Sequence, residues 1–191
     1  MASKEGTEVL GCCRQAQERL QKGDTVITIC LSCAAITEEV SPQVREVSLW
    51  EYLLQSDFPW PDHQGEEMMI QDCWRARKRP ELQQAVRECM KRMNIKPIEM
   101  EDNFAYAEFD GVWRYNPVAP GNLSIAPKYF GEVRDHGVHL LPKEEQEQRM
   151  VEWCRQYTTD RVVAYCNACL KGIRMGGANG VHLAELITQN I

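Results

Sequence analysis

The sequence has no long apolar run and no excess of basic charge, and these two absences exclude several classes of protein. None of its hydrophobic stretches approaches the roughly 18 residues of a membrane-spanning helix, so we expect no membrane insertion. Its N-terminus lacks the apolar core of a secretion signal, which predicts a cytoplasmic location. The formal net charge is −6. Because proteins that bind nucleic acid normally present a basic face, we expect no nucleic acid partner.

An even set of disulfide-forming cysteines is also lacking. The chain has 9 cysteines among 191 residues, an odd count. Disulfides are disfavoured in a reducing compartment, where paired thiols more often hold metals or turn over in redox reactions. Cys89 and Cys154 lie within helical patterns, so we expect them to be buried as small apolar side chains. The functional interest therefore rests on the other cysteines.

Two segments of the chain carry the same cysteine-bearing pattern. Residues 24–33 and residues 160–169 each read Asp, a short β-branched or apolar run, and then Cys-x-x-Cys. The match resumes farther on, where residues 47–55 parallel residues 181–189 at nearly the same offset. A repeat of this kind indicates an internal duplication, with a pseudo-twofold relation between its halves.

The duplication divides the chain into a truncated first repeat, 1–62, and a second repeat, 63–191, which we expect to form one compact globular unit. Predicted strands alternate with predicted helices, which indicates an α/β fold with a mostly parallel sheet and flanking helices. Residues 102–133 are rich in Gly, Pro, Asn and aromatic residues, and we expect a long functional or lid-like loop there. Residues 171–177 are predicted to be a flexible glycine-rich loop.

Five cysteines follow the ends of predicted strands. In parallel sheets, ligands gather beyond the carboxyl ends of the strands, so these thiols are expected to meet there. Thiolates in a Cys-x-x-Cys turn suit zinc or an iron–sulfur cluster, and the same turn also serves as a dithiol redox pair. The candidates are Cys30, Cys33, Cys73, Cys166 and Cys169.

The second half of the chain resembles a known family. Residues 72–77, a strand-end cysteine followed shortly by an arginine, and residues 165–170, with Cys-x-x-Cys, resemble the opening and closing segments of the cysteine-rich CCG domain. That domain occurs twice in the B subunit of heterodisulfide reductase. The resemblance covers roughly residues 68–191 as one domain and residues 8–56 as the rear part of another.

The chain departs from the family at the motif that gives the domain its name. In place of Cys-Cys-Gly it has Phe109-Asp110-Gly111, which keeps the glycine and lacks both thiols. Asp110 could instead supply a carboxylate oxygen to a metal. The opening strand of the first repeat is missing, and the adjacent Cys12 and Cys13 lie in a predicted helix without an assigned role.

The resemblance implies an iron–sulfur cluster, of the four-iron (4Fe-4S) type, and zinc is the alternative. The principal site is expected at Cys73, Cys166 and Cys169, with Asp110 beside them. His136 or His139 could contribute an imidazole instead. Cys30 and Cys33 are further candidate metal ligands, and a separate dithiol pair or a structural turn are the other interpretations of these two residues.

The resemblance also implies a function, as an electron-transfer or thiol/disulfide-handling component of a larger reductase. We accordingly expect a redox partner subunit or a second copy of the chain, and a thiol or disulfide substrate. Trp113, Arg114 and Tyr115 would line a pocket for an anionic thiol. Two alternatives stay open: a zinc-binding or metal-free protein that keeps the fold to bind partners, and a dithiol oxidoreductase that uses Cys30 and Cys33.

Overall fold

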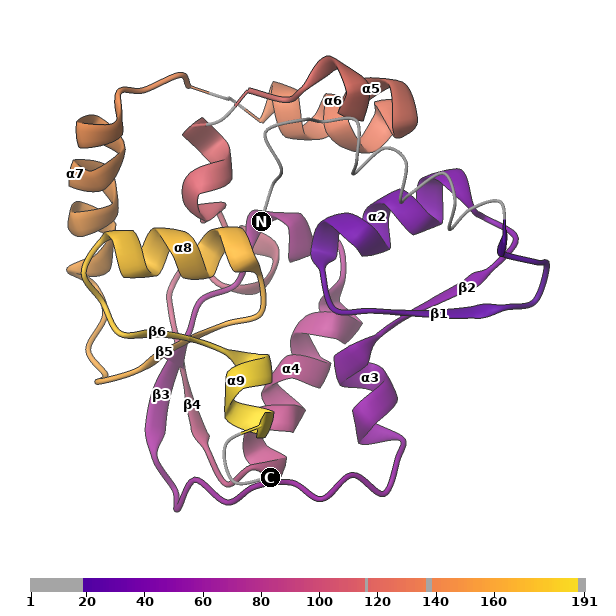
Figure 1. The fold of residues 1–191 in the computed structure, drawn as a ribbon. Coiled ribbons are helices and arrows are strands. Elements are labelled where there is room, and N and C mark those ends of the chain that lie inside the picture. Colours follow the sequence, from indigo (N-terminus) through magenta and orange to yellow (C-terminus); the bar gives the residue numbers. More distant parts are fainter. Residues whose placement is uncertain (1–18, 116, 137–138, 189–191) are drawn as a thin grey trace. The chain divides into compact units, whose positions relative to one another are not determined.

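The chain is a mixed α/β protein in which helices flank parallel strands, as the alternation of elements predicts (Figure 1). The computed structural model describes residues 19–115, 117–136 and 139–188. None of the helices in this described part of the chain is long and apolar enough to cross a membrane.

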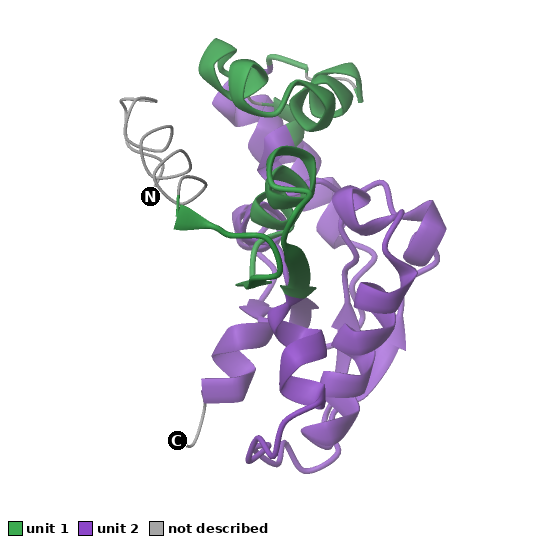
Figure 2. Cartoon of the chain, turned by 90° about the vertical axis from the view of Figure 1, so that its right-hand side faces the viewer, with its two compact units in different colours: residues 1–47, 114–140 green, residues 48–113, 141–191 purple. Residues whose placement is uncertain are grey.

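The chain forms two compact units (Figure 2). Unit 1 comprises residues 1–47 and 114–140, and unit 2 comprises residues 48–113 and 141–191. Each unit is therefore assembled from two separate stretches of sequence. This division differs from the repeat boundary, which concerns the origin of the sequence, and the duplication stays a prediction.

Unit 2 is built on a four-stranded sheet whose neighbouring strands are all parallel. Every residue of Val162–Ala164 is buried, and Glu67–Ile70 buries three of its four residues. Continuous apolar runs of this kind are typical of parallel strands that are covered on both faces. The strands are β3 (Glu67–Ile70), β4 (Lys96–Glu99), β5 (Val162–Ala164) and β6 (Gly180–His182), in the spatial order β4-β3-β5-β6.

The path of the chain reverses between β3 and β5. From β3 the chain runs through α4 (Pro80–Arg92) to β4 on one side. Strand β5 lies on the other side of β3 and leads through α8 (Asn167–Met175) to β6. In open α/β sheets, ligands bind beyond the carboxyl ends of the strands at such a reversal. The topology therefore singles out the loops that follow β3 and β5.

The helices of unit 2 follow the apolar periodicity of the sequence. Helix α4 begins at Pro80, where a missing backbone N–H is harmless, and it buries Leu82, Val86 and Cys89. Helix packing is pairwise, α3 with α4 and α7 with α8. The other helical segments are α3 (Leu49–Leu54), η1 (Trp74–Ala76), η2 (Phe104–Tyr106), η3 (Gly111–Tyr115), α7 (Lys143–Cys154) and α9 (Leu183–Thr188).

In its described residues, unit 1 contains a two-stranded sheet and the helices α2, α5 and α6, whose bounds follow. Strands β1 (Thr25–Thr28) and β2 (Arg45–Ser48) pair, and α2 (Leu31–Val40) connects them. Helix α2 packs against α6 (Pro127–Asp135), which follows α5 (Pro120–Ile125). The Glu39 carboxylate accepts the backbone N–H groups of Lys128 and Tyr129 at 2.8 Å each. A side chain of α2 thus satisfies two open donors in the first turn of α6.

The long loop expected over residues 102–133 is wrong, because much of this stretch is helical. It contains η2, η3 and α5, and α6 begins before its end. Pro120 and Pro127 occupy the first positions of α5 and α6, where proline favours a helix. The prolines that suggested a loop therefore mark helix starts.

The glycine-rich loop expected over residues 171–177 is also wrong, because α8 continues to Met175. Gly172 lies inside this helix at a point of close packing. A Cβ atom there would lie 2.9 Å from the Cα of Gly111 and 3.2 Å from the ring of Phe109. This glycine reflects tight contact between backbones and not a flexible turn.

The two cysteine-bearing segments have the same local fold. Each runs in the order strand, helix, strand, helix: β1, α2, β2, α3 in one and β5, α8, β6, α9 in the other. Cys30 and Cys166 are the extended N-cap residues of their helices, with φ/ψ of −109°/126° and −136°/124°. In both, the carbonyl of this cysteine accepts the backbone N–H four residues on at 2.9 Å. The local structures agree, and the duplication itself stays a prediction.

Candidate metal centre

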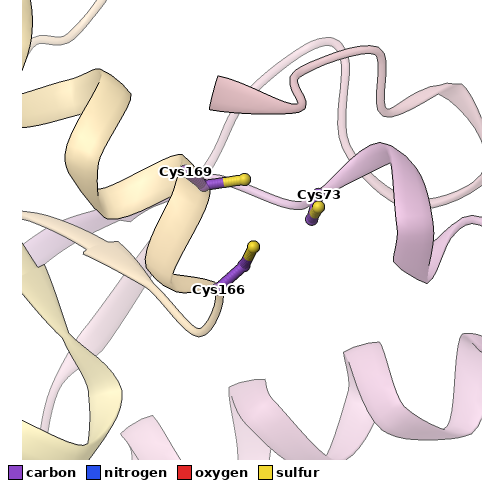
Figure 3. A group of neighbouring side chains, drawn as sticks. All are labelled: Cys73, Cys166 and Cys169. Atoms are coloured by element: carbon purple, nitrogen blue, oxygen red, sulfur yellow. The ribbon is translucent and has the colours of Figure 1, made fainter. Parts of the chain in front are cut away.

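Three buried thiols meet beyond the carboxyl ends of β3 and β5. Cys73 follows β3, Cys166 follows β5, and Cys169 lies in the first turn of α8. Their Sγ atoms all lie within 4.8 Å of one another. Figure 3 shows the three sulfurs turned toward a common space. The group could therefore bind a metal ion.

The start of α8 explains how two of these thiols converge. Cys166 has extended backbone angles and its carbonyl accepts the first helical hydrogen bond, from the N–H of Leu170 at 2.9 Å. Cys169 stands three residues on, and side chains at this spacing share one face of a helix. The Cys-x-x-Cys turn thus presents both sulfurs on the side that faces the loop after β3.

A buried ion pair borders the thiols. The Cys73 thiol donates to Oδ1 of Asp110 at 3.5 Å, and Nε of Arg75 donates to the same oxygen at 2.9 Å. Nη2 of Arg75 lies 2.8 Å from that oxygen and 3.3 Å from Sγ of Cys166. The Trp113 ring lies under the guanidinium, 5.0 Å from its central carbon. The guanidinium thus bridges a carboxylate and a thiol sulfur inside the protein.

The backbone around Asp110 is held against α8 by a contact that requires glycine. Gly111 has a φ of +54°, and a Cβ atom there would lie 2.0 Å from the carbonyl oxygen of Ala168. The carbonyl of Phe109 accepts the N–H of Trp74 at 2.8 Å and the thiol of Cys169 at 3.8 Å. Gly111 therefore allows this loop to pack directly on the first turn of α8.

One buried carboxylate, that of Asp72, connects the loops that follow β3 and β5. Asp72 is fully buried, and its two oxygens accept hydrogen bonds from Arg87 at 3.1 and 2.9 Å and from the Tyr165 hydroxyl at 2.7 Å. The N–H of Phe104 and the amide of Gln83 complete the set at 2.9 and 3.3 Å. Asp72 and Tyr165 each stand one residue before a cysteine of the cluster, so this carboxylate fixes both loops together.

The three thiols differ in acidity. Burial raises the pKa of Cys73 and of Cys169 well above the usual range. Hydrogen bonds from Cys169 and Cys73, together with the charge of Arg75, hold the pKa of Cys166 well below it. Burial also raises the pKa of Asp110, against the opposing charge of Arg75. Of the three thiols, Cys166 is therefore the most acidic.

The other predicted ligands lie in unit 1. Cys30 is the N-cap residue of α2 and half-buried, and Cys33 is exposed in the first turn. His136 Nε2 lies 3.2 Å from Nη2 of Arg114, and the backbone N–H of His139 donates to the Arg114 carbonyl at 2.9 Å. Within the described ranges, the cluster of unit 2 is the one group of three or more close metal-binding side chains.

The remaining cysteines need less comment. Cys12 and Cys13 lie outside the described residues. Cys89 is buried within α4, as the helical pattern predicts. Cys154 is the last residue of α7 and half-buried, and its thiol donates to the carbonyl of Ile173 at 3.6 Å.

Residue patterns alone did not identify the ion pair or the buried network. Arg75 entered only through the family resemblance, and Asp72 and Tyr165 had no assigned role. A signal was nevertheless present for Asp72 and Tyr165, because each of them closely follows a buried strand, where an unpaired polar group would be costly. Trp113 contacts Arg75, and its expected place in a substrate pocket stays a prediction.

Comparison with known proteins identified no relative of this chain. No protein-family model matches the chain, and no curated protein and no solved structure matches it. The resemblance to the CCG domain therefore stays a prediction, and the residues around the three thiols are the basis for a function.

Proposed function

We propose that the chain binds one soft divalent metal ion, zinc foremost, through Cys73, Cys166 and Cys169. The observation that carries the proposal is the convergence of three buried Sγ atoms within 4.8 Å of one another. A tetrahedral ion with metal–sulfur bonds of about 2.3 Å holds its sulfurs about 3.8 Å apart, so small side-chain rotations would complete the set. In a four-iron cluster each thiolate ligates a different iron, which sets the sulfurs farther apart. The spacing thus favours a single ion.

The number of ligands bears on the kind of site. Structural zinc sites usually have four protein ligands, whereas catalytic sites have three and keep the fourth position for water or substrate. Here three sulfurs converge, and the nearest carboxylate, Asp110, is paired with Arg75. This arrangement supports a reactive centre. A bound ion would act as a Lewis acid that favours the thiolate form of a thiol substrate, and we infer that such thiols are handled here.

The protein's own groups would tune such a centre. Arg75 donates to the sulfur of Cys166 and so offsets the negative charge that three thiolates bring together. The Asp72–Tyr165 contact sets the separation of the two cysteine-bearing loops. Partners of this kind around metal ligands typically change metal affinity 10–100-fold, roughly, when they are removed.

The test is metal content, with absorption spectra, on protein purified without oxygen. We expect about one zinc per chain, and loss of that metal in each of the variants Cys73→Ser, Cys166→Ser and Cys169→Ser. Cys33→Ser is the matched control, because it removes the second cysteine of the other Cys-x-x-Cys turn and should leave the metal bound. Retention of full metal by the three cluster variants would contradict the proposal.

The same measurement separates the alternatives. Iron with acid-labile sulfide and a broad visible band would support the cluster and the reductase component that the CCG resemblance implies. Absence of any metal would favour a thiol redox centre, a second candidate supported by the lowered pKa of Cys166. There the Cys166 thiolate would attack a substrate disulfide and release one thiol. Cys169 would then displace the other, which leaves a Cys166–Cys169 disulfide.

A further inference from the structure

An oxygen of the Asp110 carboxylate lies as far from the Cys73 sulfur as two ligands of one metal ion would lie from each other, but it is not this close to all three sulfurs. Its Oδ1 is 3.5 Å from Sγ of Cys73. Around one tetrahedral ion, with bonds of about 2.3 Å to sulfur and about 2.1 Å to oxygen, the two atoms would be about 3.6 Å apart. Asp110 is nevertheless not part of the group whose ligand atoms all lie within 4.8 Å of one another. The carboxylate therefore stands beside the fourth position and not in it.

Arg75 accounts for this placement. Two of its nitrogens, Nε at 2.9 Å and Nη2 at 2.8 Å, contact the same oxygen of Asp110 that faces Cys73. Both side chains are nearly inaccessible, with 3% and 2% of their surface exposed, so the pair is strong and not screened by water. The guanidinium is itself fixed by Cys166 and by the Trp113 ring.

The backbone on both sides of Asp110 is fixed by packing and by a hydrogen bond. Gly111 packs against the first turn of α8, and the carbonyl of Phe109 is hydrogen-bonded to the N–H of Trp74. Only the side-chain torsions of Asp110 are available to move its oxygens. Rotation about these torsions would turn the carboxylate between Arg75 and the sulfurs.

We propose that Asp110 is an exchangeable fourth ligand of the metal centre, and that Arg75 competes with the metal for its carboxylate. The inference rests on the proposed metal site and adds how its fourth position is controlled. When Arg75 holds the carboxylate, the position is open to a small exogenous thiol. When the carboxylate turns to the metal, the position is closed. Because the cluster is buried, only small ligands are admitted.

The experiment uses Co²⁺ as the probe in the full chain, with 2-mercaptoethanol as the exogenous thiol. Visible absorption reports the ligands of Co²⁺, and a fourth thiolate adds intensity to the sulfur-to-cobalt charge-transfer bands. In Asp110→Asn the competing carboxylate is gone, so we expect the Kd for 2-mercaptoethanol to fall about tenfold. In Arg75→Gln the carboxylate is released to the metal, so we expect that Kd to rise about tenfold.

Two further variants keep the test decisive. Arg75→Gln combined with Asp110→Asn leaves no lone buried charge, and it should bind 2-mercaptoethanol as Asp110→Asn does. Glu108→Gln is the matched control, because Glu108 lies two residues away, in an exposed pair with Arg77 at 2.8 Å. It should match the unaltered chain.

The outcomes separate this inference from the proposed function. If the unaltered chain and all variants hold Co²⁺ but bind 2-mercaptoethanol equally, the exchange of Asp110 is wrong and the metal site stands. If Arg75→Gln tightens thiol binding when Asp110 is present, competition for the carboxylate is also wrong. If the unaltered chain does not hold Co²⁺ at Cys73, Cys166 and Cys169, both proposals fail.

Discussion

Gly111 is a residue outside the three cysteines whose replacement would disturb the packing around the cluster. Its left-handed backbone, with a φ of +54°, brings the loop that carries Asp110 onto the first turn of α8. Gly172 lies on the other side of the same contact, so two backbones meet without side chains between them. The match of Gly111 to the glycine of the Cys-Cys-Gly motif stays a prediction from the resemblance, whereas the steric need for glycine at this position is visible only in the structure.

The variant Gly111→Ala should therefore be strongly destabilised. A left-handed backbone costs a non-glycine residue about 1–2 kcal/mol, and forced overpacking adds about 1–3 kcal/mol. Gly65→Ala is the matched control, since Gly65 has a φ of +79° with no atom within 4 Å of a new Cβ. Urea unfolding should show a clearly larger loss for Gly111→Ala. Equal losses would mean that the contact with α8 does not constrain residue 111.

At the scale of elements, the site is formed by two loops, one after β3 and one after β5, that hydrogen bonds hold together. Asp72 after β3 and Tyr165 after β5 are 93 residues apart, and they share a hydrogen bond of 2.7 Å. Arg87 reaches the same carboxylate from α4, with its charge also paired to Glu99. The cysteines are consequently placed by a network that reaches well beyond their own loops.

The variant Tyr165→Phe removes one hydrogen bond to this buried carboxylate, which should cost about 1.5–3 kcal/mol of stability. Because the bond joins the two cysteine-bearing loops, we also expect the zinc affinity to fall about tenfold, measured by competition with a chelator. Tyr157→Phe is the control, since its hydroxyl donates to the neutral amide oxygen of Gln71 at 2.9 Å. It should lose about 1 kcal/mol and keep its zinc affinity. A similar loss of affinity in both variants would contradict this role of Tyr165.

Local patterns predicted most elements but not this network. Strands β3 and β5, helix α4 and the strand-end cysteines follow from apolar runs, a proline helix start and the ligand rule for parallel sheets. The helices between residues 102 and 133 were missed because proline marks loops and helix starts alike. The partners of Asp72 come from distant segments, and no short window of sequence contains their pairing.

At the scale of the whole molecule, the cysteine cluster belongs to one of the two compact units. All three thiols, with Asp110 and Arg75, belong to unit 2. The sequence repeat could not predict this division, because unit 1 takes in residues 114–140 from the middle of the second repeat. Similar sequence patterns do not show which segments make contact, whereas compact units are defined by contacts between segments that can lie far apart in the chain.

Metal binding should accordingly stabilise unit 2 selectively. A free metal concentration of 100 times the Kd adds about 2.7 kcal/mol to the stability of the state that binds it. In hydrogen exchange with and without zinc, amides in residues 164–170 and 71–76 should exchange more slowly. Amides of α2 in unit 1 serve as the internal control and should not change. Equal slowing in α2 would contradict a metal centre confined to unit 2.

The order of the strands also has a consequence for synthesis of the chain on the ribosome. Strand β5 becomes the neighbour of β3, although β4 is made between them and pairs on the other side. The nascent chain therefore carries Cys73 and Asp110 for a long interval before Cys166 and Cys169 emerge. During that interval a single cysteine of the set is present, which is too few to capture a metal firmly. Any capture of a metal by this set would thus be a late event, after every strand of the sheet except β6 has been made.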